Sequence, residues 1–130
     1  MDTSALVAAL VADHEHHPLA RPHLPAATAL PAIVLAETYS QLRRTFGQTA
    51  AGATALLAPW AGDPKRVLPT TGAAVVTALG RAAELDLGGN IHDALVAEVC
   101  REHRKPLVTL DTRQHRLALA LGTRSTYLLA

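Results

Sequence analysis

The hydrophobic and polar positions of the chain alternate between helix and strand signals. Apolar residues run continuously or recur at helical spacing over segments 5–14, 32–44, 49–61, 71–86 and 91–105. Shorter apolar runs predict strands at 66–69, 106–110 and 125–129. The pattern predicts that the first helix begins directly after Asp2, with Thr3 or Ser4 as its N-cap. The proline-rich stretch 17–31 is expected to be a connector, and Gly88-Gly89 a break before the helix at 91–105.

Strands separated by helices need crossover connections, which place neighbouring strands parallel. The pattern therefore predicts a three-layer α/β/α fold, with a mainly parallel central sheet and helices on both of its faces. A chain of 130 residues is the size of one domain with one core. We expect a single domain over residues 1–130.

Composition narrows the class of protein. The chain is 49% hydrophobic and 18% charged, which is typical of a globular protein. A net charge of +1 argues against a protein that coats nucleic acid non-specifically, but it allows a local basic rim. The single cysteine, Cys100, cannot form an internal disulfide. A membrane span is not expected, because no apolar run reaches about 18 residues. A signal peptide is not expected, because the first apolar stretch has no basic flank before it. Together with the single cysteine, this favours a cytoplasmic protein.

Acidic residues follow two of the predicted strands. Asp111 ends the strand at 106–110, and Asp2 would end a first strand that has only Met1 before it. In open parallel sheets, ligands bind beyond the carboxyl ends of the strands. Helix capping also explains an acid at such a position, and the two roles are compatible.

A third acid, Asp93, points to the inner side of its helix. The polar stripe of helix 91–105 consists of Glu98, Arg101, Glu102 and Lys105. At 100° per residue, Asp93 lies about 130° from the centre of that stripe, on the side of Ala97 and Cys100. The alternative is a helix-start residue that the helix dipole tolerates. Glu37, a fourth acid, lies in "VLAETYSQL" and by itself would be a solvated helix residue.

Four segments together resemble a known family. These are the initial Asp-Thr-Ser, "LAETYSQLRR", "HDALVAEVCREHRKPLVTLD" and the terminal "LGTRSTYLL". In this order they are similar to PIN-domain ribonucleases, specifically the toxin subunit of VapBC-type toxin–antitoxin pairs. The resemblance covers nearly the whole chain.

The resemblance implies an acidic pocket of Asp2, Glu37, Asp93 and Asp111, with Ser4 and Thr109 as supporting hydroxyls. It also implies Mg²⁺ or Mn²⁺, an RNA substrate such as tRNA or rRNA, and a cognate VapB-type antitoxin that blocks the site. Hard oxygen ligands suit these ions, and Mg²⁺ usually takes only one or two carboxylates directly. We expect Asp2 and Asp93 to be direct metal ligands and Asp111 to bind closely or through water. Glu37 would orient or deprotonate the attacking water. A homodimer is expected.

The chain departs from the family at two places. Such toxins usually have several strand residues before the first acid, so the first strand here is very short or the start lies upstream. Many relatives carry an apolar or aromatic residue just after the last acid, where this chain has Arg113, Gln114 and His115. This second departure concerns substrate contacts more than the metal site.

Other polar clusters have competing interpretations. The segment "DHEHH" at 13–17 suggests zinc, but its spacing matches no HExxH-type site, and a solvated helix end is favoured. The pairs Arg43–Arg44 and Arg113–Arg116 fit an RNA-binding rim or simple surface solubility. Trp60 is expected in the core or at a dimer contact rather than as a base-stacking platform.

Two alternative functions remain at this stage. A phosphoacceptor receiver domain also places acids at strand ends, but it needs an adjacent acidic pair, whereas Thr3 follows Asp2. It also needs a lysine after the last core strand, and neither Lys65 nor Lys105 is well placed. A catalytically inactive PIN-like binding module is disfavoured by the intact set of acids.

Overall fold

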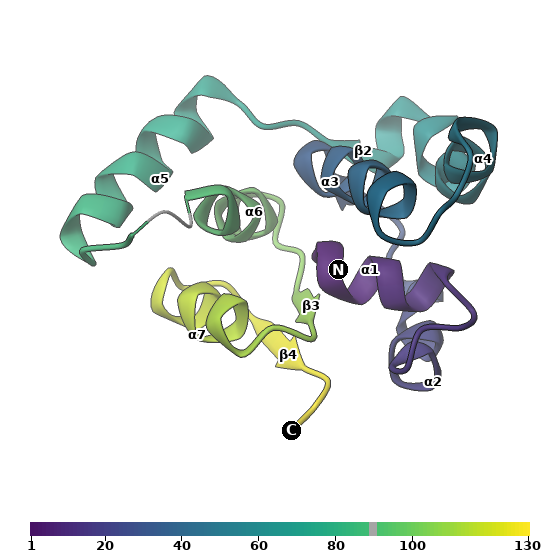
Figure 1. Cartoon of the computed structure of the whole chain (residues 1–130). Coiled ribbons are helices and arrows are strands. Elements are labelled where there is room, and N and C mark those ends of the chain that lie inside the picture. Colours follow the sequence, from purple (N-terminus) through teal and green to yellow (C-terminus); the bar gives the residue numbers. More distant parts are fainter. Residues whose placement is uncertain (89–90) are drawn as a thin grey trace.

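The computed structural model describes residues 1–88 and 91–130. Its α-helices are α1 (Thr3–Leu10), α2 (His17–Ala20), α3 (Ala32–Arg44), α4 (Ala50–Ala61), α5 (Gly72–Glu84), α6 (Ile91–Glu102) and α7 (Thr112–Ala120). Two 3₁₀ turns, η1 (Arg21–Ala26) and η2 (Pro64–Arg66), connect them. The strands are β1 (Leu30–Pro31), β2 (Val67–Leu68), β3 (Leu107–Thr109) and β4 (Ser125–Tyr127). The alternation of helices and strands is visible in Figure 1.

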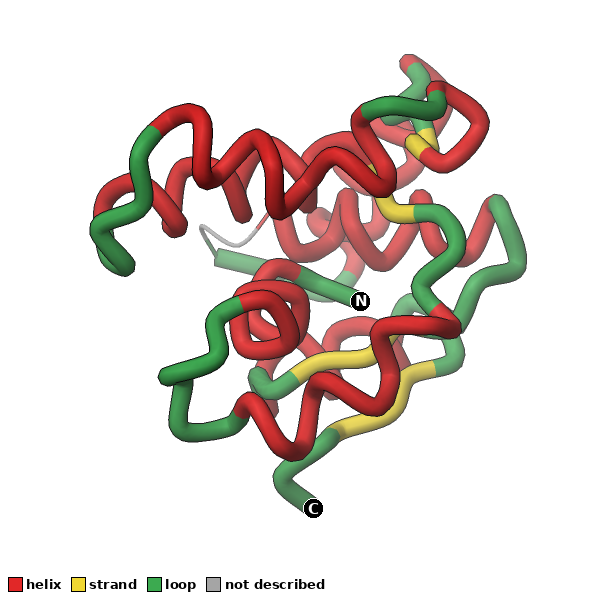
Figure 2. The backbone as a smooth tube through the Cα atoms, turned by 90° about the vertical axis from the view of Figure 1, so that its right-hand side faces the viewer, coloured by secondary structure: helices red, strands yellow, loops and turns green. Residues whose placement is uncertain are grey.

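The strands are parallel, as the sequence predicts, and the chain has an α/β fold. They form two separate pairs, β1 with β2 and β3 with β4, instead of the single continuous sheet that we expected. Figure 2 shows the β3–β4 pair apart from the shorter β1–β2 pair. Pro31 lacks a backbone N–H, and α3 starts at the next residue, so β1 cannot be longer on that side.

The expected first strand is absent as a strand, but its position beside β3 is filled. The backbone N–H of Asp2 donates to the carbonyl of Val108 at 2.9 Å. The chain then enters α1 at Thr3, with Asp2 as the N-cap in place of the expected Thr3 or Ser4. The N-terminal residues therefore run next to β3 without forming a ladder.

Several predicted bounds are wrong for local reasons. The first helix ends at Leu10 and not at 14, because Val11 turns to an extended conformation. The stretch 17–31 is not a plain connector: it forms α2, η1 and β1, and Pro18 and Pro22 occupy first-turn positions that need no N–H donor. The helix at 91–105 ends at Glu102, since Arg104 adopts a left-handed conformation with φ of 54°.

The sequence pattern missed one helix, α7. Asp111 caps its N-terminus, and Gly122 (φ 82°) follows its C-terminus. Helix 71–86 is confirmed with slightly shorter bounds, Gly72–Glu84. Of the expected glycine break, Gly88 is described and Gly89 lies outside the described residues.

The core surrounds α1, whose residues Ala5 to Ala9 are buried. Leu30, Leu42 and Leu107 come from other elements into the same cluster. Trp60 belongs to it too, as expected: it is 2% exposed, and its Nε1 donates to the carbonyl of Ala27 at 2.7 Å. Because α1 is central, the N-terminal residues that precede it lie between α3 and β3 (Figure 1).

One predicted surface residue is buried. Glu98, assigned by its spacing to the solvent stripe of α6, is only 2% exposed. Helix α5 packs along α6 and leaves the Glu98 carboxylate in contact with the guanidinium of Arg101 one turn later. The sequence pattern did not reveal this second neighbour of α6.

Among the residues described, no helix has the length and apolar character needed to cross a lipid bilayer.

Candidate active site

Asp2 is fixed by a network of short-range and long-range hydrogen bonds. Its Oδ1 accepts from the backbone of Ala5 at 3.0 Å and from the hydroxyl of Ser4 at 2.8 Å. Its Oδ2 accepts from the hydroxyl of Thr109. Asp2 is 7% exposed, and this burial raises the pKa of its carboxyl against the opposing effect of the hydrogen bonds. Ser4 and Thr109, the two hydroxyl residues named from the resemblance, thus both donate hydrogen bonds to Asp2.

Asp111 lies at the junction of β3 and α7 and does cap the helix. Its Oδ1 accepts from the backbone N–H of Arg113 at 2.7 Å and of Gln114 at 3.3 Å. Its own N–H donates to the Thr109 hydroxyl at 2.9 Å. The capping interpretation and the pocket interpretation of Asp111 are therefore both correct as geometry, since capping occupies only one of its two carboxylate oxygens.

Glu37 reaches the same region from α3. Its Oε2 accepts from the hydroxyl of Thr3 at 2.8 Å. This contact joins the start of α1 to α3 and leaves Glu37 half-buried instead of fully solvated. The neighbouring turn of α3 adds Gln41 on the same face.

Asp93, in the first turn of α6, faces inward as its helical position predicts. It is half-buried, and among the described residues no donor contacts its carboxylate. Burial raises the pKa of Asp93, and so, to a smaller degree, do the negative charges of Asp111, Glu37 and Asp2; Arg113 opposes them. All three other acids therefore contribute to the raised pKa of Asp93.

The four acids line one cavity of about 150 Å³, here called the acidic cavity. That volume holds several water molecules, at roughly 30 Å³ each. The other lining residues are Thr3, Ser4, Gln41, Val96 and Gln114. The structure thus brings together residues that α1, α3, α6 and the β3–α7 junction supply.

Sequence reasoning missed Gln41 and Gln114 as members of this site. Gln114 is 2% exposed, and its Nε2 donates to the backbone carbonyl of Asp93 at 3.1 Å. Its Oε1 is buried, and no hydrogen-bond partner of it lies among the described residues. The available signals were the spacings from acids already identified, four residues after Glu37 and three after Asp111.

Of the four arginines expected at the rim, Arg113 is the one whose charge acts on an acid of the cavity. Arg113 is close enough for its charge to lower the pKa of Asp93. Arg116 lies beside Arg113 along an apolar groove that Leu85, Leu87, Leu117 and Ala120 line. Neither Arg43 nor Arg44 lines the acidic cavity, and Arg43 donates to the carbonyl of Gln48 at 2.8 Å.

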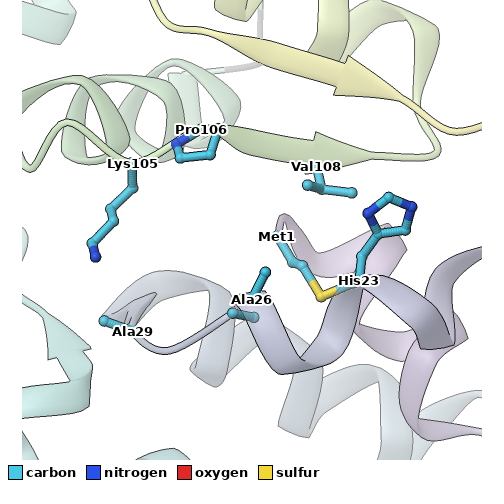
Figure 3. A pocket seen from close by; sticks show the side chains of 8 residues that line it. Met1, His23, Ala26, Ala29, Lys105, Pro106 and Val108 are labelled. Atoms are coloured by element: carbon cyan, nitrogen blue, oxygen red, sulfur yellow. The ribbon is translucent and has the colours of Figure 1, made fainter.

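A separate cavity of about 70 Å³ lies on the other side of the N-terminus. It is lined by Met1, His23, Ala26, Ala27, Ala29, Lys105, Pro106 and Val108. Figure 3 shows Met1 and His23 beside Val108, and to their left Lys105 and Pro106, which precede Val108 in the chain. No carboxylate lines this cavity, so it offers no hard oxygen ligands from side chains for a divalent cation.

The PIN domain family model matches residues 1–119. This span contains all four acids of the cavity together with Ser4 and Thr109. The chain belongs to the PIN-domain family. None of the curated proteins compared with this PIN domain matches it. Membership excludes the receiver-domain alternative and supports nuclease chemistry in general, because PIN domains are generally metal-dependent nucleases.

The donor set of the acidic cavity fits a hard divalent cation. Both oxygens of Asp93, Oδ2 of Asp111 and Oε1 of Glu37 accept no hydrogen bond from the described residues. Within the same part of the chain, no group of three or more His, Cys, Asp or Glu side chains is placed to hold an ion by itself. This arrangement is compatible with Mg²⁺, which keeps several waters and takes one or two carboxylates directly.

Proposed function

We propose that this PIN domain is a Mg²⁺- or Mn²⁺-dependent endoribonuclease of the VapC toxin type, which hydrolyses RNA phosphodiester bonds and is neutralised by a cognate VapB-type antitoxin. One observation carries the proposal: four carboxylates from four parts of the chain line one cavity, and burial and mutual repulsion raise the pKa of Asp93. Such convergence is unfavourable for folding alone and needs a cation to balance it.

Asp93 and Asp2 are the proposed direct ligands of the metal, and Asp111 binds it through water. Asp93 has two carboxylate oxygens without donors among the described residues, and Asp2 keeps one lone pair on the oxygen that Thr109 contacts. When bound, the metal ion would neutralise the negative charge that develops on the phosphoryl oxygens. Thr109 and Ser4 position Asp2, while Asp111 stays fixed by its amide contacts with α7.

Glu37 is the proposed residue that orients or deprotonates the attacking water. Its Oε2 accepts from Thr3, and its Oε1 accepts no hydrogen bond from the described residues, so it is available to a water molecule in the cavity. The leaving group would be the 3′-oxygen, which gives a 5′-phosphate and a 3′-hydroxyl. Arg113, whose charge lowers the pKa of Asp93, is the proposed contact to the RNA backbone near the cleaved bond. Arg116 extends that contact.

The proposed antitoxin places a basic side chain, by preference arginine, against the carboxylates. Arginine matches carboxylate geometry in bidentate fashion, and the cavity offers several acceptors. The protein itself is proposed to be a homodimer. Exposed apolar side chains on α5, Val76 at 70% and Leu79 at 55%, support an association of this kind.

The experiment that tests the function uses the purified protein free of any antitoxin. We expect it to cleave single-stranded RNA with Mg²⁺ or Mn²⁺, and EDTA to abolish the cleavage. Product ends are identified by phosphatase and ligase treatment. Undiminished cleavage in EDTA would overturn the metal-dependent mechanism, whereas RNA that stays intact with both ions would favour the inactive binding module.

A further inference from the structure

A second groove adjoins the acidic cavity on the side of α1 and α3. It has a volume of about 290 Å³ and shares Ser4 and Gln41 with the acidic cavity. Its distinguishing side chains are His14, His16 and Phe46, and we call it the aromatic groove. Because Ser4 and Gln41 line both spaces, the aromatic groove lies directly beside the acidic cavity.

Three aromatic rings lie close together in this groove. The ring centroids of His14 and Phe46 are 5.8 Å apart, and those of His14 and His16 are 5.7 Å apart. Phe46 is the only phenylalanine of the chain, yet it is partly exposed. Phenylalanine is among the residues most often fully buried, so its position at a groove beside the acids is unusual for a packing role.

The backbone holds these rings in place. The N–H of Phe46 donates to the carbonyl of Gln41 at 3.3 Å, and the turn continues through Gly47, whose φ of 64° favours glycine. The N–H of His16 donates to Nδ1 of His14 at 3.1 Å. Neutral His14 therefore carries its ring proton on Nε2, which leaves that atom as a donor.

The histidines at 14 and 16 are not the solvated helix end that the sequence favoured. Both are partly buried, in a turn after α1. His17 differs, because its Nδ1 lies 2.9 Å from the carbonyl of Ala8 and serves the fold. Among the described residues, no group of three or more His, Cys, Asp or Glu side chains is placed to hold an ion at this cluster.

The charge of the groove indicates what it binds. No lysine or arginine lines it, and its charged member, Glu15, is negative. A phosphate would be repelled there, whereas a neutral nucleobase can stack on aromatic faces. Arg113, whose positive charge lowers the pKa of Asp93, comes from α7 and does not line the aromatic groove.

We propose that Phe46, His14 and His16 form a stacking subsite for an unpaired nucleobase of the RNA strand whose phosphate lies in the acidic cavity. The proposal rests on the ribonuclease function proposed above and adds how the substrate is held. It requires the RNA to be single-stranded at the cleaved bond, because a paired base is not free to enter the groove. Recognition by stacking tolerates different bases, since every base has a π-face.

Binding of a short single-stranded RNA tests the subsite. The parent is Asp93→Asn, so that the RNA stays intact, and the RNA carries 2-aminopurine beside the cleavage position. Affinity is measured by fluorescence anisotropy and stacking by quenching of the 2-aminopurine emission. Phe46→Ala should weaken binding by about 5-fold or more, the loss typical of one stacked base, and reduce the quenching. Phe46→Trp should restore both.

Matched variants separate stacking from charge and from folding. Tyr39→Ala removes another partly exposed aromatic ring, one that lies outside the groove, and should leave affinity unchanged. Phe46→Ala should leave the salt dependence of binding unchanged, whereas Arg113→Ala should lower the slope of log K against log salt by about 0.7. Melting curves check that each variant is folded.

The outcomes distinguish the two proposals. If the wild type cleaves RNA but Phe46→Ala binds the labelled RNA with full affinity and quenching, the stacking subsite is wrong and the ribonuclease function stands. If the wild type neither binds nor cleaves RNA, the function fails and the subsite fails with it. If Phe46→Ala keeps RNA binding but loses binding of the antitoxin, the groove is a protein-binding surface instead.

Discussion

The hydroxyl of Thr109 donates a hydrogen bond to Asp2, although the two residues are 107 positions apart in the sequence. The same hydroxyl accepts the backbone N–H of Asp111 at 2.9 Å. One buried side chain in β3 therefore fixes two acids of the cavity relative to each other. Since Thr109 has no accessible surface, this arrangement excludes water from the inner side of the site.

Thr109→Val should destabilise the protein and impair cleavage. Valine keeps the shape of threonine but leaves a buried carboxylate oxygen and a buried N–H without their partner, at a cost of about 1–3 kcal/mol. Urea unfolding measures the stability, and RNA cleavage with Mn²⁺ measures the activity of the folded variant. Thr123→Val is the matched control, because its buried hydroxyl donates to the carbonyl of Ala97 away from the acidic cavity. That control should lose stability and keep activity, so equal activity of both variants would contradict a positioning role for Thr109.

Asp93→Asn should abolish RNA cleavage while leaving the metal-free protein as stable as the wild type or more stable. The charges of Asp111, Glu37 and Asp2 all disfavour ionised Asp93, and a neutral amide of similar shape removes that repulsion. Mg²⁺ should raise the melting temperature of the wild type through binding to the folded state, and this shift should shrink in the variant. Melting curves with and without Mg²⁺ at fixed pH test the prediction. A full metal response together with full activity would show that Asp93 is only a helix-start residue.

The stability difference between wild type and Asp93→Asn should depend on pH. The pKa of Asp93 is raised above its ordinary value of 3.8, so the metal-free folded state holds its proton more tightly than the unfolded state. The contribution of Asp93 to stability is thus complete below pH 3.8 and is lost as pH rises through the folded-state pKa. Over that pH window we expect the free energy of unfolding of the wild type to fall relative to that of Asp93→Asn. Above the window the difference between the two should stay constant. Urea titrations without metal at a series of pH values measure the difference. A difference that stays constant with pH would contradict the raised pKa of Asp93, which burial and then the neighbouring charges cause.

The sequence predicted three acids of the site from local signals, whereas Glu37 was assigned only through the family resemblance. Asp93 was identified from its angle to the polar stripe of α6, and Asp111 from the strand before it. Gln114 had only its spacing of three residues after Asp111 as a signal: its burial comes from packing of α7 against α6, which a one-dimensional pattern does not contain. The position of Asp2 was expected from a strand that does not form, and a single backbone bond to Val108 replaces it.

The parts of the fold that were missed also depend on tertiary neighbours. Strand β1 is two residues long and begins at Leu30 within a proline-rich stretch, too short for any periodicity. Glu98 fits the polar stripe of α6 by spacing, yet it is buried in a helix that α5 packs along. Periodicity identifies which face of a helix is apolar, but it does not show that a second element covers the polar edge.

Breaking the ion pair between Glu98 and Arg101 should change the stability of the protein and not its activity. Arg101→Met should destabilise the protein by about 1–3 kcal/mol, because it leaves the Glu98 carboxylate buried without the guanidinium that holds it. The figure lies below the 3–5 kcal/mol typical of a fully buried pair, because the Arg101 side chain is 46% exposed and water reaches its side of the pair. The double variant Glu98→Gln with Arg101→Met should recover most of the loss, since no buried charge remains. Denaturant unfolding of both single variants and the double variant gives the coupling energy.

Neither residue lines the acidic cavity, so RNA cleavage by the folded variants should stay at the wild-type level. An additive cycle, with no coupling between the two changes, would show that the buried carboxylate does not depend on Arg101.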